Sequence, residues 1–154
     1  MKGIVEKIRI YTEKGAAGIE LADAHLIENL GLEGDLARGG ERQVSVLFAE
    51  TRAQMEELRE KGLCLSRFKE NITVGCKEKC KELKPGDRLS AGEAVLEISG
   101  ESKRCHGECA LFEAGKPCSL AGMSLFAKVI KSGRIRNGDR IYQQTCKKSL
   151  KCIY

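Results

Sequence analysis

The sequence has no tryptophan, and aromatic residues make up only 5% of its 154 residues. Because proteins that grip nucleic acid stack bases on aromatic rings, this scarcity argues against a nucleic-acid partner. No apolar run approaches the roughly 20 residues of a membrane-spanning helix. The first residues also lack the charged-then-apolar order of a secretion signal. We therefore expect a cytoplasmic protein with neither nucleic acid nor a membrane as its partner.

Several catalytic motifs are missing as well. The Gly-rich stretch 28–40 lacks the Gly-Lys-Ser/Thr ending of a P-loop. We find no Ser-His-Asp arrangement, no paired-carboxylate motif and no lysine motif for pyridoxal phosphate. Only two histidines occur, and His25 lies among alternating apolar residues, as is typical of a histidine on a strand surface rather than a ligand.

What the sequence does contain suits one folded domain. Apolar residues make up 42% and charged residues 32%, which is typical of a globular chain. We place the domain at residues 1–142 and predict that the basic tail, 143–154, is flexible. A net charge of +5 suits a small phosphorylated or otherwise anionic ligand. A solvated surface without any partner explains the charge equally well.

Strand-like patterns separated by turns dominate the chain. The one firm helix is 50–61, with Met55 and Leu58 facing inward and Gly62 as its stop. Many short strands with one helix predict a mainly β (α+β) fold, a barrel or a sandwich. The predicted strands are 3–11, 19–27, 43–48, 68–74, 88–89, 94–98, 126–130 and 134–142.

Eight cysteines are present, and in the cytoplasm we expect thiols, metal ligands or redox groups rather than structural disulfides. Cys105 lies just before a short predicted helix around 110–114. The N–H groups at a helix start and the neighbouring Lys103, Arg104 and His106 favour a thiolate, which is the reactive form. We predict a working thiol at Cys105. The alternative is a semi-buried structural thiol.

The neighbours of Cys105 permit two further interpretations. Cys109 and His106, with Cys118, could complete a tetrahedral zinc site around Cys105. Alternatively, Cys109 could resolve a persulfide or sulfenate on Cys105, since residues i and i+4 share one helical face. The spacing of Cys76 and Cys80 is weakly diagnostic. No role is predicted for Cys64, Cys146 or Cys152.

A series of short motifs resembles the MOSC family, the homologues of the C-terminal domain of molybdenum-cofactor sulfurase. The resemblance covers about residues 1–142 and suggests the small stand-alone form. The motifs are Gly-Leu-Glu-Gly-Asp at 31–35, Arg-Gln-Val-Ser at 42–45, Glu-Asn-Ile-Thr at 70–73, Pro-Gly-Asp at 85–87, Gly-Glu-Ala at 92–94, Cys-His-x-x-Cys-Ala at 105–110 and Phe-Ala-Lys-Val at 126–129.

The resemblance implies a closed or nearly closed β-barrel with a few peripheral helices. It also implies molybdenum-cofactor chemistry, in which relatives carry sulfur on a cysteine or hold the metal–pterin and reduce N-oxygenated compounds. Cys105 matches the family's key cysteine, a catalytic residue and molybdenum ligand. Arg42 and Gln43 match its polar pair, and Asn71 its Glu-Asn-Ile site.

Other residues complete the predicted site. Arg42, Lys103 and Arg104 suit the phosphate of an anionic pterin. Gly34 and Asp35 could bring backbone N–H groups near an anion, or could simply turn the chain. Arg42 opens a strand that we expect to be buried, so it needs a partner to offset its desolvation. A ligand phosphate and Glu70 are both candidates.

The chain departs from the family pattern at two places. The family's Gly-Asp-x-His reads Gly-Asp-Leu-Ala at 34–37, and its Pro-Arg-Glu-Gly is replaced by Leu-Ala-Gly-Met-Ser-Leu at 120–125. Both changes remove polar groups from the predicted pocket.

Three functions follow as hypotheses. A cysteine desulfurase loads Cys105 with a persulfide, whose sulfur passes to an acceptor such as a bound pterin or a molybdoenzyme. Alternatively, Cys105, Cys109 and Cys118 hold structural zinc. The third hypothesis is a non-catalytic protein that only binds the cofactor.

Overall fold

The structure, a computed structural model, describes residues 1–58, 67–76, 83–100, 103, 105, 107–109 and 124–145. Strands make up most of this part of the chain, and one helix is found in it, α1 (Ala49–Leu58). The strands are β1 (Lys2–Ile10), β2 (Ile19–Leu21), β3 (Asp23–Ile27), β4 (Gly31–Leu32), β5 (Val44–Phe48), β6 (Ile72–Cys76), β7 (Arg88–Ala91), β8 (Ala94–Ile98), β9 (Leu125–Lys131), β10 (Gly133–Arg136) and β11 (Arg140–Gln143).

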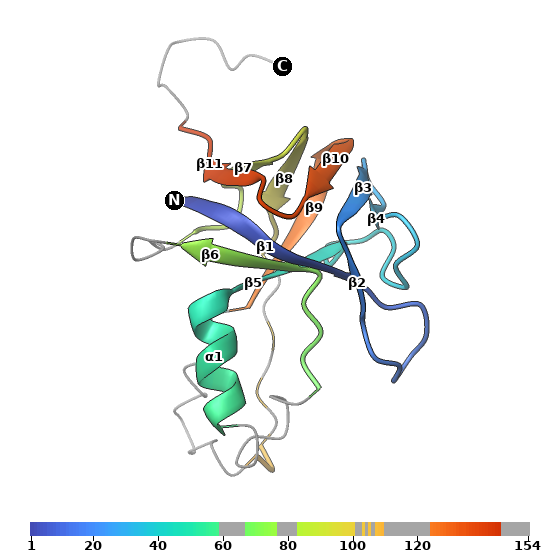
Figure 1. Cartoon of the computed structure of the whole chain (residues 1–154), viewed down its shortest axis with the longest axis vertical. Coiled ribbons are helices and arrows are strands. Elements are labelled where there is room, and N and C mark those ends of the chain that lie inside the picture. The colour runs from blue at the N-terminus through green and yellow to red at the C-terminus, as the bar shows by residue number, and fades with distance from the viewer. Residues whose placement is uncertain are drawn as a thin grey trace.

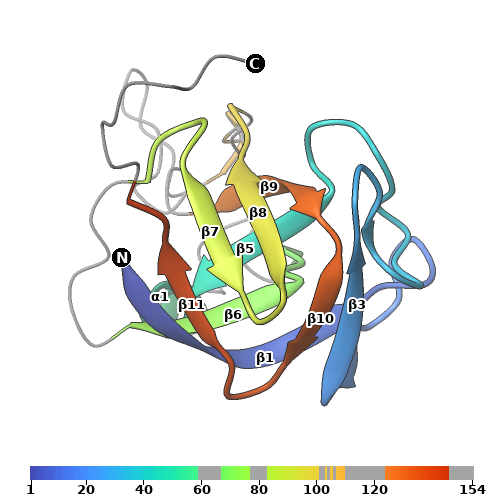
Figure 2. The same cartoon turned by 90° about the horizontal axis from the view of Figure 1, so that it is seen from above.

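Seven strands close into a barrel, in the order β11-β7-β8-β9-β5-β6-β1. The barrel closes because β1 pairs with both β6 and β11. Figure 2 looks onto the ring of strands, with β1 and β11 crossing near one another. β5 and β6 run parallel, and the other barrel pairs are antiparallel. The expected mainly β barrel with a peripheral helix is confirmed.

A small second sheet, in the order β10-β3-β4, lies beside the barrel (Figure 1). β2 extends the barrel sheet next to β1, and β3 follows it in the second sheet. One hydrophobic core joins the barrel and the second sheet. Apolar side chains from alternate strand positions form it, because successive side chains point to opposite faces of a strand. Val5, Leu96, Ile135 and Ile141 are examples of its completely buried members.

Two segments that we predicted as single strands, 19–27 and 134–142, are wrong in one respect. Each of them forms two strands, and the two strands belong to different sheets. Segment 19–27 bends at Ala22, whose carbonyl accepts a hydrogen bond from the Asn137 backbone N–H (2.9 Å). Segment 134–142 is divided by a turn in which Gly138 has a φ of 90°. One straight strand could not pair with partners in both sheets, so the chain turns where it changes sheet.

Other boundaries also shift. The predicted strand 68–74 begins only at Ile72, and β4 is not predicted at all. The helix is confirmed at Ala49–Leu58, with Met55 buried. The Leu58 side chain, Gly62 and the predicted helix at 110–114 lie outside the described residues. Within the described parts of the chain, no helix is long and apolar enough to cross a membrane.

Candidate functional site

Cys105 lies on the long connection between β8 and β9. Ser99 closes the base of that connection, because its backbone N–H and hydroxyl both donate to the Phe126 carbonyl (2.9 and 3.1 Å). Cys105 is half-buried and Cys109 is buried, and neither cysteine is disulfide-bonded. In Figure 1 the orange part of this connection lies beyond the barrel, at the same end as α1.

Lys103, two residues before Cys105, is held against the barrel by an aromatic ring. Its ammonium nitrogen lies 4.7 Å from the centre of the Phe68 ring. Phe68 is itself fixed, because it is buried and its carbonyl accepts a hydrogen bond from Arg52 Nη2 (3.2 Å). A cation over a ring face is attracted by the ring's quadrupole. This contact therefore ties the Cys105 segment to the chain that enters β6.

Arg42 makes a second contact of this kind. Its guanidinium carbon lies 4.8 Å from the centre of the Phe126 ring, on β9. Arg42 is exposed, so the argument that it needs a partner to offset burial is wrong. The arginines that bind Glu70 are Arg9 and Arg52.

Gln43 and Asn71 are buried, and their amides bond within the fold. Gln43 donates to the Gly40 carbonyl (2.9 Å) and accepts from the Val129 N–H (3.0 Å). The Asn71 oxygen accepts from the backbone N–H and the hydroxyl of Ser45 (both 2.9 Å). Its nitrogen donates to the Arg9 carbonyl and to Asp35 (both 3.2 Å). The single hydrogen of the Ser45 hydroxyl is also within reach of the Lys69 carbonyl (2.8 Å). An amide has two acceptor sites and two hydrogens, so the fold engages at least three of these four on Asn71.

Gly34 and Asp35 form a turn beside Asn71. Gly34 has a φ of 81°, a conformation that glycine adopts without strain. The Asp35 carboxylate accepts from the backbone N–H groups of Tyr11 (2.7 Å) and Ala37 (3.0 Å). These contacts favour the chain-turning interpretation. Binding of an anion or cofactor by Gly34, Asp35, Gln43 and Asn71 stays a prediction.

Next to Asn71 lies a charged cluster that we did not predict. Glu70 is only 1% exposed, and its carboxylate accepts from Arg9 Nη1 (2.8 Å) and Arg52 Nε (3.0 Å). Arg52 Nη2 contacts its other oxygen. A buried carboxylate is tolerated when cations and hydrogen bonds compensate it. Glu70 thus joins β1, α1 and the start of β6 beside Phe68.

The sequence indicates this cluster only through Glu70 itself, an acidic residue just before an apolar strand. Its partners Arg9 and Arg52 are 61 and 18 positions away. No local pattern connects residues at such separations, so the pairing becomes visible only in the folded chain.

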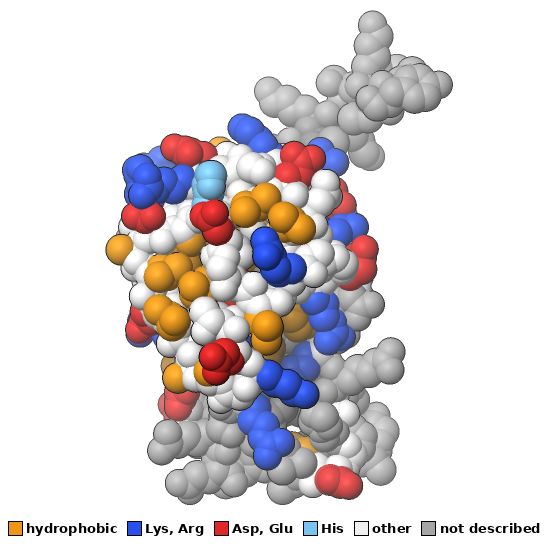
Figure 3. Space-filling model, turned by 90° about the vertical axis from the view of Figure 1, so that its right-hand side faces the viewer, with side chains coloured by type: hydrophobic (Ala, Val, Ile, Leu, Met, Phe, Trp, Pro, Cys, Tyr) orange, Lys and Arg blue, Asp and Glu red, His pale blue; other side chains and the backbone are white. Residues whose placement is uncertain are grey.

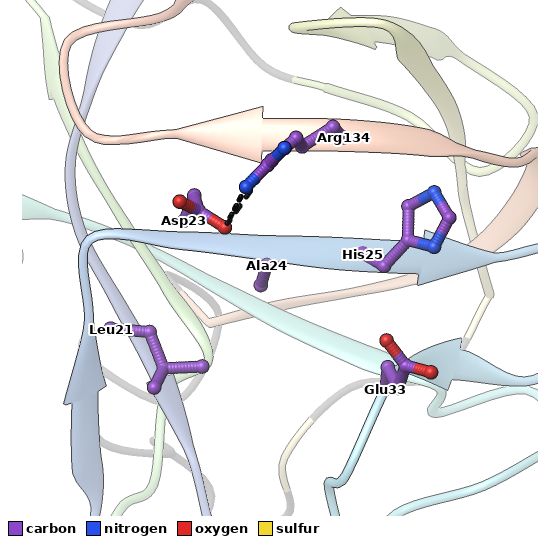
Figure 4. A pocket seen from close by; sticks show the side chains of 6 residues that line it. All are labelled: Leu21, Asp23, Ala24, His25, Glu33 and Arg134. Atoms are coloured by element: carbon purple, nitrogen blue, oxygen red, sulfur yellow. Dashed lines mark hydrogen bonds and ion pairs between the residues drawn. The ribbon is translucent and has the colours of Figure 1, made fainter.

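A separate hollow of about 350 Å³ lies over β3 and β10 (Figure 4). Arg134 donates to Asp23 across it (2.9 Å), and His25 lies on the exposed face of β3, as predicted. Figure 3 shows this side of the molecule, where apolar side chains lie among acidic and basic ones. None of the predicted site residues lines the hollow. The two sites are therefore distinct.

The cysteine predictions have mixed outcomes. Cys76, at the end of β6, is disulfide-bonded, so the expectation of thiols is wrong for this residue. In the described ranges no three His, Cys, Asp or Glu side chains are placed to hold a metal ion. Arg104, His106 and Cys118 lie outside these ranges, as do Cys64, Cys80, Cys146 and Cys152, so the zinc hypothesis stays untested.

A family model for the MOSC domain matches residues 33–142. This match spans well over half of the chain, and it includes the site described above. The chain belongs to the MOSC domain family. This family is associated with the molybdenum cofactor. No sequence among the curated proteins matches the chain.

Solved structures support the MOSC fold. The YuaD protein from Bacillus subtilis has a TM-score of 0.67 and 20% identity, covering 92% of this chain and 94% of that chain. YiiM from Escherichia coli has a TM-score of 0.58 and 20% identity, with 94% and 70% covered. YiiM from Geobacillus stearothermophilus has a TM-score of 0.63 and 17% identity, with 94% and 76% covered. At these identities the likeness shows a shared fold.

Proposed function

We propose that this MOSC domain acts in molybdenum-cofactor chemistry through Cys105, as a persulfide carrier, as a ligand of a molybdenum–pterin, or as both. The observation that carries the proposal is the half-buried Cys105 thiol, which is not disulfide-bonded and matches the position of the family's key cysteine. Lys103 lies two residues away, and the Phe68 ring holds its ammonium group. The thiolate is the form of a cysteine that attacks and binds metal.

The side chains at this site are of the chemical types that would bind the metal and the phosphate of a molybdenum–pterin. Thiolate is a soft ligand, and the side chains of Arg42 and Lys103 are cations that would bind phosphate oxygens. When bound, the cofactor would supply a redox-active metal for reducing N-oxygenated compounds. Gln43 and Asn71 support the site from within, because their amides fix the chain before β5 and β6.

In the sulfur-carrier role, Cys105 receives sulfur from the persulfide of a cysteine desulfurase. The Cys105 thiolate attacks the outer sulfur of that persulfide and forms a new S–S bond. The donor's S–S bond breaks, and the donor cysteine leaves as a thiolate, so no external oxidant or reductant is needed.

The first experiment measures whether Cys105 gains sulfur as a persulfide. We expect purified wild-type protein, mixed with a cysteine desulfurase and free cysteine, to gain sulfur on Cys105, as located by peptide mass spectrometry. Cys105→Ser should remove this adduct and leave the circular dichroism spectrum unchanged. Cys109→Ser is the matched control, and it should still be loaded because Cys105 is the attacking thiol. Loading that persists at full level in Cys105→Ser would contradict the proposal.

The cofactor role needs a second measurement. The protein is produced in a host that makes molybdenum cofactor and then examined by anaerobic native mass spectrometry. A mass increase that fits a molybdenum–pterin, lost in Cys105→Ser, supports the ligand role. If neither a pterin nor a sulfur adduct appears, Cys105 has no part in this chemistry. The cytoplasmic location and a desulfurase or molybdoenzyme partner belong to the same proposal.

A further inference from the structure

The outer surface of the barrel carries a groove where β1 meets β11. It encloses about 620 Å³, and five of its lining residues are Lys2, Ile4, Gly75, Arg140 and Tyr142. We name it the β1–β11 groove. It lies where the barrel closes, and its backbone groups already pair across the seam. A partner would therefore have to bind through side chains rather than add a strand.

The strand register sets the pattern of the groove. Lys2 lies opposite Tyr142, and Ile4 lies opposite Arg140. All four side chains are exposed and lie on the outer face, since Ile141, between Arg140 and Tyr142, is buried in the core. The two cations therefore occupy one diagonal of a four-residue patch, and the two apolar side chains occupy the other. Diagonal neighbours of this kind are about 7–8 Å apart.

The apolar half of the patch is open to solvent. Ile4 is 41% exposed and Tyr142 is 47% exposed. Across from Ile4 on β6, Gly75 has no side chain, and the exposed Glu6 side chain lies over it. A ligand that approaches Gly75 would therefore have to displace the flexible Glu6 side chain.

The charged half has no internal compensation. Neither Lys2 nor Arg140 is ion-paired with any carboxylate of the described residues. By contrast, Lys7 on β1, Arg88 on β7 and Arg134 on β10 are all ion-paired. The lining of the groove includes Lys2 and Arg140 and, among the described residues, no acidic one, and the Glu6 carboxylate lies beside it over Gly75. The whole chain has the same sign, with a net charge of +5. Complementary charge speeds association and selects between partners.

From this pattern we propose that the β1–β11 groove docks an acidic segment of a partner protein that carries an apolar or aromatic anchor. The anchor packs between Ile4 and Tyr142, and flanking carboxylates bind Lys2 and Arg140. Exposed apolar side chains rimmed by charge are typical of such sites. This interaction does not involve the Cys105 site. A failed test of the docking proposal would therefore leave the proposed function untouched, and the reverse is also true.

A fluorescent peptide, Asp-Glu-Leu-Phe-Glu-Asp, serves as the probe, and its anisotropy is measured with the full-length protein. Wild-type protein should bind it, and a peptide with serine for Leu and Phe should bind at least about fivefold more weakly. Tyr142→Ser and Arg140→Glu should each weaken binding of the original peptide by a similar factor. Both residues are on the surface, so thermal unfolding should remain close to wild type.

Lys131→Glu is the matched control, because it makes the same charge change at an exposed position on β9, away from β1 and β11. It should keep near-wild-type affinity. The double variant Lys2→Glu/Arg140→Glu should instead prefer the reversed peptide Lys-Arg-Leu-Phe-Arg-Lys.

Three results overturn the proposal. The first is that wild-type protein does not bind the peptide at all. The second is that Lys131→Glu weakens binding as much as Arg140→Glu, because binding then follows net charge alone. The third is that sedimentation shows a dimer that Tyr142→Ser dissociates, because a second copy of the chain then occupies the groove.

Discussion

Tyr11 shows how a single side chain connects the charged cluster to the loop before β2. Its hydroxyl donates to the Glu70 carbonyl (3.1 Å), and the Lys69 ammonium lies 4.8 Å from the centre of its ring. Gly18 packs so closely that a Cβ there would come within 2.8 Å of the ring. Burial, followed by the negative charge of Glu70, raises the pKa of Tyr11 above its ordinary value of 10.0. Tyr11 therefore stays protonated where an unfolded tyrosine would ionise.

This shift predicts how stability depends on pH. With its pKa raised in the folded state, Tyr11 contributes stability that is fully present below pH 10 and is lost as the pH rises through the folded-state pKa. Tyr11→Phe should cost about 1 kcal/mol at neutral pH, through the lost hydrogen bond. Above pH 10 its stability should fall less steeply than that of wild type. Urea unfolding between pH 7 and about pH 11 tests this, and parallel curves would contradict it.

Individual residues of the site could be found from the sequence, but not their contacts. Gln43 and Asn71 stand out because each is a polar residue at the start of an apolar strand. Whether such an amide faces a ligand or the protein depends on its hydrogen bonds, and Ser45 and Asp35 provide those of Asn71. Both partners are more than 25 positions from Asn71, beyond any local pattern.

At the scale of elements, local patterns predict a strand well but not the sheet to which it belongs. Segment 19–27 has one continuous apolar pattern, yet β2 pairs with β1 and β3 pairs with β10. The Gly-Asp-Arg sequences at 86–88 and 138–140 behave differently, because the turn residues themselves determine the conformation. Gly86 and Gly138 both have a φ of 90°, and β7 and β11 begin two residues later.

Gly133 determines how β10 approaches the barrel. A Cβ on this residue would come within 2.5 Å of the Glu93 carbonyl carbon and 2.6 Å of the Ala94 nitrogen. These are backbone atoms at the turn between β7 and β8, so they cannot rotate away. We expect Gly133→Ala to destabilise the protein by about 2 kcal/mol, as overpacking in a close-packed interior does. Chemical denaturation gives the free energy of unfolding directly.

The control is Gly100→Ala, where no atom lies within 4 Å of the added Cβ and φ is outside the left-handed range. Its effect should stay within about 0.5 kcal/mol, as for ordinary surface substitutions. Equal destabilisation by both variants would show that the cost comes from losing glycine in general and not from the contact with Glu93 and Ala94.

For the whole molecule, the resemblance to the MOSC family predicted the barrel, and the strand patterns alone did not. Alternating apolar residues suit a barrel and a sandwich equally. The difference lies in the pairing of β1 with β11, which joins Lys2 to Tyr142 across almost the entire chain. Such a contact leaves no local signal in the sequence. The structure therefore adds both the closure of the barrel and the groove along its seam.

The closed barrel also predicts how the protein responds to loss of metal. Its described core is formed by apolar side chains from both sheets, and each buried side-chain nitrogen or oxygen in the described residues has a hydrogen-bond partner. A fold that completes its own core does not need the free energy that structural zinc gives to small domains. We therefore expect a strong chelator to leave the thermal midpoint of the barrel unchanged.

A classical zinc-finger peptide in the same buffer is the control and should unfold. If the barrel instead unfolds and releases zinc in a 1:1 ratio, the structural-zinc hypothesis for Cys105, Cys109 and Cys118 replaces the working-thiol proposal.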